Sequence, residues 1–241
     1  MNLLKFSWRR FFIVILLILI MIPLIMFLVW RCSAGRELNM LTIDKTSLTQ
    51  AARERYSLFW VLHHNKFLNF GNLPSVNEDY YGFFPHNKKQ YEIRDLDSLA
   101  ADSIQALANK YNILYIADTY GIYASDWYKN SSIDNPEKIL YGGLNHSDFE
   151  LMQEMQTQKK TIVLEFNSII PPTTYNVRKN ISESFGVHWT GWRGRYFKSL
   201  DTNKTALSKV IIKRYLKNHN GHWPYEKAGI VLLNNSKGTV I

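Results

Sequence analysis

The sequence predicts an α/β domain with a mainly parallel sheet and helices on both faces, preceded by one N-terminal transmembrane helix. Residues 11–30, FFIVILLILIMIPLIMFLVW, form an apolar run without a charge. Twenty residues at about 1.5 Å each span the ~30 Å hydrocarbon core of a bilayer. After this run, apolar strand-like segments alternate with helical segments, which is the pattern of a parallel α/β sheet.

The apolar run is predicted to stay in the mature protein. A cleaved signal peptide has a shorter apolar region and ends at small residues, whereas this run ends in Trp30-Arg31-Cys32. More basic residues precede the run than follow it, which places the N-terminus in the cytoplasm. The predicted organisation is therefore a cytoplasmic N-terminus, a transmembrane helix, a linker and an extracytoplasmic (periplasmic) domain, at residues 1–10, 11–30, 31–37 and 38–241.

Charge and cysteine content exclude several classes of function. The net charge of +9 divides into +4 up to Glu37 and +5 in the remainder, where no lysine-arginine block stands out. We therefore expect no nucleic-acid partner, and either an ordinary soluble surface or weak attraction to an anionic membrane or glycan. Cys32 is the only cysteine, so the domain has no disulfide, cysteine metal site or thiol nucleophile. No histidine spacing indicates a metal, and no cofactor is predicted.

The elements of the domain follow in chain order. We predict strands at 38–43, 91–93, 113–117, 139–141, 161–166 and 229–233, with residues 238–241 resembling the start of another. Helices are predicted at 51–66, 98–111, 148–160, 175–185 and 205–217. Thr49, Asp95 or Asp97, and Ser147 with Glu150 are the expected N-terminal caps of the first three. Residues 69–89, rich in turn-forming residues, are predicted to be a loop.

The ends of the predicted strands carry the candidate chemistry. Ligands of open α/β sheets bind beyond the carboxyl ends of the strands. Asp118 and Glu165 follow two strands expected at the centre, and Asn167 lies just after the second. The two carboxylates fit acid–base or nucleophilic roles, or binding of a cation or sugar hydroxyls. The alternative is that they cap loops and helices. Asp44 and Gly142-Gly143 lie at the same expected edge.

Two segments carry a resemblance to a known fold. The strand-turn-helix LYGGLNHSDFELMQEMQTQKK and the strand-turn TIVLEFNS resemble the class I glutamine amidotransferase-like fold over roughly residues 38–235. That family needs an elbow cysteine and a downstream histidine-glutamate pair, but residues 165–168 read Glu-Phe-Asn-Ser. The resemblance therefore implies a degenerate relative without glutaminase activity, of the kind found beside glycan-processing enzymes. The motifs DKT, DYYGFFP, ADTYGIY, YGGL, EFN and WTGWRGRYF also resemble uncharacterised membrane-anchored proteins of Bacteroidetes-type bacteria.

The segment VHWTGWRGRYF, residues 187–197, is the second candidate site. Trp189 and Trp192 could form a stacking platform for sugar rings, while Arg193 and Arg195 could hold a carboxylate or phosphate. The alternative is a packed corner whose glycines supply unusual backbone angles.

Three functional interpretations stay open. The leading one is a membrane-anchored extracytoplasmic domain that binds a glycan, an envelope component or a protein partner. The second is a hydrolase of envelope polysaccharide that uses the carboxylate pair, and the third is a structural subunit. Two carboxyl groups about 5–10 Å apart in an open cleft favour the enzyme, whereas buried and capped carboxylates favour binding or structure.

Overall fold

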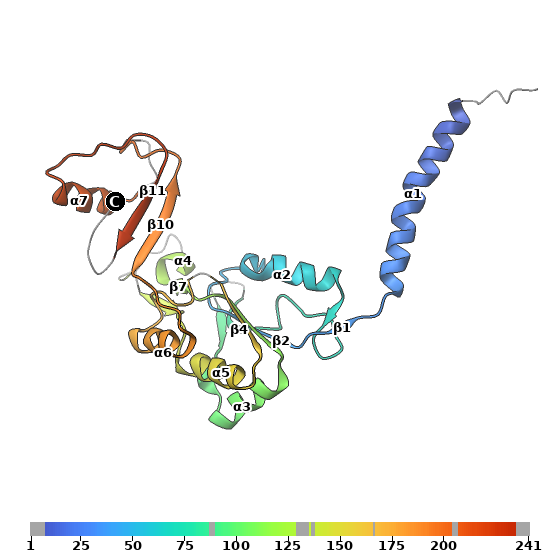
Figure 1. Cartoon of the computed structure of the whole chain (residues 1–241), viewed down its shortest axis with the longest axis horizontal. Helices are drawn as coiled ribbons and strands as arrows, with labels where there is room; N and C mark the ends of the chain where they lie inside the picture. The colour runs from blue at the N-terminus through green and yellow to red at the C-terminus, as the bar shows by residue number, and fades with distance from the viewer. Residues whose placement is uncertain are drawn as a thin grey trace, which may run out of the picture.

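The computed structural model describes residues 8–86, 90–128, 135, 138–165, 167–203 and 207–234. Figure 1 shows three parts along the chain: the N-terminal helix α1, a central α/β unit, and a smaller lobe at the C-terminal end. We call residues 38–186 the α/β unit and residues 187–241, described to 234, the C-terminal lobe.

Helix α1 (Trp8–Cys32) contains the predicted apolar run. None of its residues is buried by the rest of the chain, and the helix is long and apolar enough to cross a membrane. Pro23 lies inside it, as membrane helices tolerate.

The segment predicted as a linker is docked on the body. Strand β1 (Arg36–Glu37) pairs in parallel with β3 (Phe67–Leu68). The Trp30 indole nitrogen donates a hydrogen bond of 2.6 Å to the His64 carbonyl oxygen. Lys66 Nζ donates to the carbonyl oxygens of Arg31 and Ser33 at 2.9 and 2.8 Å, where a cation complements the negative end of the helix dipole.

The central sheet confirms the α/β class with a mostly parallel sheet. Its strand order is β5-β4-β2-β6-β9, formed by Tyr91–Arg94, Tyr81–Pro85, Met40–Asp44, Ile113–Asp118 and Thr161–Leu164. Strands β4, β2, β6 and β9 run parallel, and β5 is antiparallel to β4 at one edge. Because β2 and β6 are interior strands, their residues are apolar almost without interruption.

Two apolar clusters surround the sheet. Helix α2 (Arg53–His64) contributes Phe59 and Leu62 to a cluster with strand residues Met40, Tyr115 and Ala117. The larger cluster joins the intervening strand residues to helices α3 (Ala101–Lys110), α5 (His146–Thr157) and α6 (Tyr175–Phe185); its strand members are Leu41, Ile43, Leu114 and Ile116. Successive residues of β2 and β6 therefore belong alternately to the two clusters, as side chains of a strand should.

Strand β4 overturns the prediction of a loop at 69–89. Tyr81–Pro85 pairs with both β2 and β5, although its glycine and proline read as turn residues. Gly82 has φ 144°, and a Cβ atom at this position would overlap the Asp44 carbonyl oxygen. The glycine is therefore needed for the close approach of two strands and does not mark a turn.

The helix starts differ from the predicted caps. Ala52, not Thr49, precedes α2, with left-handed φ 47° and without a side-chain cap. Asn145 caps α5 in a capping box with Asp148, two residues before the predicted pair of Ser147 and Glu150.

The third cap and two short strands complete the α/β unit. Asp95 caps the short 3-10 turn η2 (Leu96–Ser98), and α3 begins only at Ala101. The predicted strand at 139–141 exists as β8 (Ile139–Tyr141), but it pairs with β7 (Ile122–Tyr123) outside the central sheet. Helix α4 (Ala124–Tyr128) follows β7.

The C-terminal lobe has a core of its own. Strands β10 (Trp192–Phe197) and β11 (Gly229–Asn234) form an antiparallel ribbon, and α7 (Lys209–Asn218) packs on it. The buried members of this core are Phe197, Leu200, Leu207, Tyr215 and Val231. In Figure 1 the lobe and α1 extend upward from the α/β unit. The strand start predicted at 238–241 lies outside the described residues.

Candidate functional site

The carboxyl ends of β2 and β6 bring two aspartates together. Asp44 and Asp118 are opposite each other in the register of the two strands, where a register shift follows Ile43. Both side chains are buried, with exposed fractions of 0% and 8%. Buried carboxylates need partners, and each aspartate has a different set.

Asp44 is held by a buried cation and by the loop that follows it. The Arg55 guanidinium forms an ion pair with Asp44 Oδ2, and both side chains are almost completely excluded from solvent. Asp44 Oδ1 accepts hydrogen bonds from the backbone nitrogens of Thr46 and Ser47 at 2.9 and 3.2 Å. Arg55 also lies 3.6 Å above the Tyr80 ring. This aspartate is therefore a structural element of the strand end.

Both carboxylate oxygens of Asp118 accept hydrogen bonds, which disfavours a role as a free catalytic carboxylate. Its Oδ1 accepts from the backbone nitrogen of Tyr120 at 2.7 Å, and its Oδ2 accepts from Asn167 Nδ2 at 3.3 Å. Burial raises the pKa of Asp118, and the nearby Asp44 carboxylate adds to this, while the two hydrogen bonds oppose it.

Glu165 lies in a different environment from Asp118, because the strand that precedes it, β9, was predicted to be central but is an edge strand of the sheet. Its side chain is exposed, and Oε1 accepts a 2.6 Å hydrogen bond from the Tyr115 hydroxyl. Burial, followed by the Glu165 carboxylate, raises the pKa of Tyr115. Of the residues predicted at this edge, the structure thus joins Asn167 to Asp118 and gives Glu165 a separate partner.

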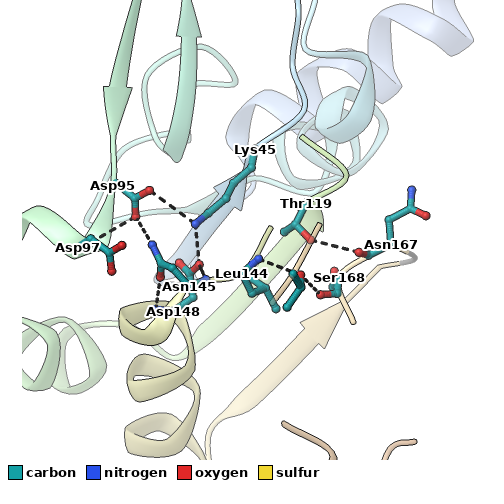
Figure 2. A network of polar contacts seen from close by, with 10 residues as sticks. Lys45, Asp95, Asp97, Thr119, Leu144, Asn145, Asp148, Asn167 and Ser168 are labelled. Atoms are coloured by element: carbon teal, nitrogen blue, oxygen red, sulfur yellow. Dashed lines mark hydrogen bonds and ion pairs between the residues drawn. The ribbon is translucent and has the colours of Figure 1, made fainter. Parts of the chain in front are cut away.

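A second buried charge network, which the sequence did not indicate, lies beside this edge (Figure 2). Lys45 Nζ forms an ion pair with Asp148 Oδ2 at 2.6 Å and lies 3.7 Å from Asp95 Oδ2. Asn145 donates to Asp95 Oδ1 at 2.8 Å through its side chain and to Asp148 Oδ2 at 2.8 Å through its backbone. Lys45 and Asp148 are only 2% and 1% exposed.

The pKa directions in this network follow from burial and from the lysine. Burial raises the pKa of Asp148, although the Lys45 ammonium opposes it. For the less buried Asp95, burial is also the largest influence, but Lys45, Tyr141 and Asn145 together outweigh it and lower the pKa. The network fastens the start of α5 to the end of β2.

A cavity of about 300 Å³ opens beside this network, between Lys45, Asp95, Tyr141 and the glycine pair. A Cβ atom on Gly142 would overlap Gly121, and one on Gly143 would lie 2.8 Å from the Thr173 nitrogen. The two glycines have positive φ, 150° and 75° respectively. Crowding by neighbouring backbone therefore explains the glycine pair.

The segment 187–197 connects the α/β unit to the C-terminal lobe. Trp189 is half-buried, donates its indole N–H to the Trp192 carbonyl at 3.2 Å and lies 5.3 Å below the Arg178 guanidinium of α6. It lines a cavity of about 250 Å³ with residues of α6. Trp192, also half-buried, begins β10 opposite Asn234. The two tryptophans are joined by this hydrogen bond at the junction of the two regions.

The two arginines belong to the ribbon of the C-terminal lobe. Arg193 and Arg195 lie on the same face of β10 as Phe197, opposite Leu233 and Val231 of β11. Arg193 is half-buried and Arg195 exposed, and the Arg195 guanidinium lies 5.4 Å from the Phe197 ring centre. The arginines therefore lie on the ribbon, while Trp189 contacts α6.

The positive charge of the body is concentrated in this lobe, although no lysine-arginine block stands out in its sequence. Residues 187–241 hold ten basic and two acidic residues, whereas residues 38–186 hold 14 basic and 17 acidic residues. The exposed basic side chains described in the lobe are Arg195, Lys198, Lys209, Lys213, Arg214, Lys217 and Lys227. Lys209, Lys213 and Lys217 follow at four-residue spacing and form one stripe along α7.

An aromatic cavity of about 400 Å³ lies in the same lobe. Tyr215, Trp223 and Tyr225 line it together with Lys227. The Trp223 indole donates to the Leu200 and Tyr225 carbonyl oxygens at 2.9 and 2.8 Å, which fixes its ring. This cavity was not predicted from the sequence, in which the run Trp223-Pro224-Tyr225 was the available signal.

Within the part of the chain that the structure describes, no group of three or more His, Cys, Asp or Glu residues is arranged to hold a metal ion. Comparison of the chain with protein-family models, with curated proteins and with solved structures found no match. The resemblance to amidotransferase-like proteins therefore rests on the sequence motifs alone.

Proposed function

We propose that this protein is a membrane-anchored binding module, without catalytic activity, whose C-terminal lobe binds an anionic glycan of the cell envelope. In this proposal α1 spans the membrane, the N-terminus is cytoplasmic and the body is periplasmic. Bound glycan would lie over the basic surface of the lobe. Neither a cofactor nor a nucleic acid has a part in this function.

The observation that carries the proposal is the separation of charge within the body. The C-terminal lobe has a net charge of +8 and the α/β unit one of −3. Charges of one sign gathered on a small lobe raise the local concentration of an oppositely charged polymer. Arginine side chains such as Arg195 also bind carboxylates in a bidentate manner.

The aromatic residues supply the second half of the recognition. The half-buried Trp192 starts the ribbon, and Tyr215, Trp223 and Tyr225 line the 400 Å³ cavity. Tryptophan and tyrosine combine a flat apolar ring with a polar group, which suits the apolar face and hydroxyl groups of a sugar. A uronic-acid polymer offers both the ring and the negative charge.

Charge reversal on α7 tests the proposal. The full chain in a zwitterionic nanodisc should bind polygalacturonate, and added salt should weaken the binding because exposed charges are screened. A triple variant, Lys209→Glu, Lys213→Glu and Lys217→Glu, should lose about tenfold or more in affinity, which is at least ~1.4 kcal/mol.

A matched control changes the same net charge elsewhere. Arg53, Lys110 and Lys159 are exposed basic residues of the α/β unit, and their triple glutamate variant should lose less than about twofold, since none of them belongs to the proposed binding surface and exposed charges are screened by salt. Equal losses in the two triple variants would contradict a site on the lobe. Tighter binding to anionic-lipid vesicles or to a DNA oligonucleotide than to the polysaccharide would instead identify a different anion.

A second candidate function is hydrolysis of an envelope polysaccharide by Asp118 and Glu165. The observation in its favour is the raised pKa of Asp118, because a general acid needs a carboxyl group that stays protonated. Against it, both Asp118 oxygens are engaged. Release of reducing ends from an envelope polysaccharide, lost in Asp118→Asn and Glu165→Gln, would establish the enzyme and overturn the binding module.

We also propose the finer reading of the fold, amidotransferase-like or flavodoxin-like with helices on both faces of the sheet. The alternation of β2 and β6 residues between the α2 cluster and the α3–α5 cluster supports it. Retention of the chain in membranes after alkaline carbonate, with the body digested by protease added to spheroplasts, would support the anchor and its orientation.

A further inference from the structure

We infer that the exposed aromatic face of α2 rests on the headgroup region of the bilayer that holds α1, so that the body lies against the membrane. The inference rests on the anchor of the proposed function but not on the binding of a glycan. Its partner is the lipid surface itself.

Helix α2 has two apolar faces, and only one is used inside the fold. Phe59 and Leu62 are buried against the sheet. On the other side, Tyr56, Trp60 and Val61 are 56%, 58% and 44% exposed. Tyr56, Trp60 and His64 follow at four-residue spacing, and the Trp60 and His64 rings stack 5.2 Å apart at 10°.

The contacts between α1 and the body place this face at the bilayer. The Trp30 indole in the last turns of α1 donates to the carbonyl oxygen of His64, the last residue of α2. Lys66, two residues further on, holds the carbonyl oxygens at the end of α1 and lies 4.8 Å above the Trp30 ring. The end of α2 is therefore within one side chain of the point where the anchor leaves the hydrocarbon.

The direction of α2 is also suitable. In Figure 1, α2 runs across the direction of α1 at the level where α1 ends. A bilayer crossed by α1 at the usual tilt of about 20° passes beside the end of α2 that α1 contacts, and the lobe, which Figure 1 shows on the same side as α1, then lies at the headgroups and not within the hydrocarbon. Tryptophan and tyrosine gather at that depth in membrane proteins, and an amphipathic helix in the interface buries its apolar face by about 5–10 Å.

Basic residues near the anchor complement a lipid surface. Arg31, Arg36 and Lys66 lie at the end of α1, in β1 and just beyond the end of α2. Lys and Arg next to a membrane helix attract anionic headgroups. The occupant favoured by both the aromatic stripe and the charges is a lipid interface that contains anionic headgroups.

The test measures lipid contact at single positions in the full chain. Cys32, the only cysteine, is replaced by serine, and Trp60→Cys is labelled with a bimane fluorophore in phosphatidylcholine–phosphatidylglycerol vesicles. Tyr175→Cys on α6, where the native side chain is 70% exposed, is the matched control. Headgroup-proximal doxyl lipid should quench position 60 roughly threefold more than position 175, and aqueous iodide should do the reverse, as expected for interfacial burial.

Each outcome decides the inference. Equal iodide access at positions 60 and 175, with no quenching by doxyl lipid, overturns it. Protection of position 60 that persists in detergent and grows with protein concentration also overturns it, because a second copy would then be the partner. Failure of the full chain to bind polygalacturonate would overturn the proposed function without changing the quenching at position 60. Carbonate extraction tests the anchor separately, so failure of the proposed function is distinguishable from failure of this inference.

Discussion

The α/β unit and the C-terminal lobe use charged residues in opposite ways. In the α/β unit, Asp44 and Arg55 form an ion pair in the interior, and so do Lys45 and Asp148. In the lobe, seven described basic side chains are exposed around a small apolar core. The buried ion pairs of the α/β unit hold strand ends and helix starts in place. The exposed basic side chains of the lobe instead produce a positive electrostatic potential in the surrounding solvent.

The difference indicates where function should be sought. A buried ion pair loses hydration and contributes little net stability, but breaking it is costly. An exposed excess of one charge does not stabilise the fold, because like charges repel each other, and it acts over a distance on partners. Strand ends are the usual place for ligands in an α/β sheet, yet here the carboxylates at these ends are largely occupied by the fold.

The largest expected effect is a loss of stability of the α/β unit. Asp44→Ala leaves the buried Arg55 guanidinium without its carboxylate, and removal of one partner of a buried pair costs about 3–5 kcal/mol. Because whole domains have about 5–15 kcal/mol of stability, urea unfolding followed by circular dichroism should shift strongly or show an unfolded unit.

Two controls accompany this variant. The double variant Asp44→Leu with Arg55→Met should lose less stability than Asp44→Ala, since no charge is stranded. Arg195→Ala in the lobe should stay within about 0.5 kcal/mol, as for an exposed residue. If Asp44→Ala and Arg195→Ala shift the urea midpoint equally, the contrast between the two regions is wrong.

A middle-sized effect tests whether the lobe is an independent unit. Trp223→Ala removes an indole that donates to two carbonyl oxygens and packs edge-on against Tyr215 and Tyr225. A loss of about 3 kcal/mol is expected, the lower end for a large aromatic that is only half-buried. Hydrogen exchange should lose protection in β10, β11 and α7 while β2 and β6 keep theirs. Equal loss of protection in both regions would show a single cooperative unit.

The smallest effect concerns Asp118 and pH. Its folded-state pKa is raised by burial, so ionisation above that pKa disfavours the folded state. Asp118→Asn, which cannot ionise, should therefore gain stability relative to the native chain at pH 7, by no more than about 1 kcal/mol, the size of one hydrogen-bond contribution.

The pH dependence of stability shows whether the folded-state pKa of Asp118 is raised or lowered. The stability advantage of the Asp118→Asn variant should shrink as the pH falls through the folded pKa of Asp118 towards ~3.9, the ordinary value of aspartate. Thermal melts of both proteins between pH 4 and 8 measure it. A native chain that is the more stable at pH 7, with a margin lost on acidification, would mean that the pKa of Asp118 is lowered.

Those parts of the fold that depend on local pattern could be predicted from the sequence. The interior strands β2 and β6 and the edge strand β9 are apolar runs, and α6 follows a proline pair, so all were located. Strand β4 was not, because Gly82 is read locally as a turn and its real cause, the approach of the Asp44 carbonyl oxygen, is a contact between distant residues. Asn145 and Ser147 are equally good capping residues, so the start of α5 was placed two residues late.

The contacts at the candidate site that could not be predicted join residues that are far apart in the sequence. Lys45 and Asp148 lie 103 residues apart, and nothing beside either residue indicates the other. Strand β10 pairs with β11, more than 30 residues later, so the segment at 187–197 was interpreted as either a stacking platform or a packed corner, and its pairing as a strand was not predicted. The charge asymmetry was present in the sequence but disappeared when charges were counted over the whole body.

The docking of residues 31–37 has a consequence for how far the body can reach. A free linker of seven residues would have a root-mean-square length of about 14 Å and would let the body swing around the end of its anchor. Here β1 pairs with β3, and Lys66 donates hydrogen bonds to the carbonyl oxygens of Arg31 and Ser33 at the end of α1. Residues 31–37 are therefore not a free linker. If α1 anchors the body in a membrane as proposed, a body held in this way would search for its ligand by lateral diffusion in two dimensions, at one fixed height, and the ligand would have to come to that height.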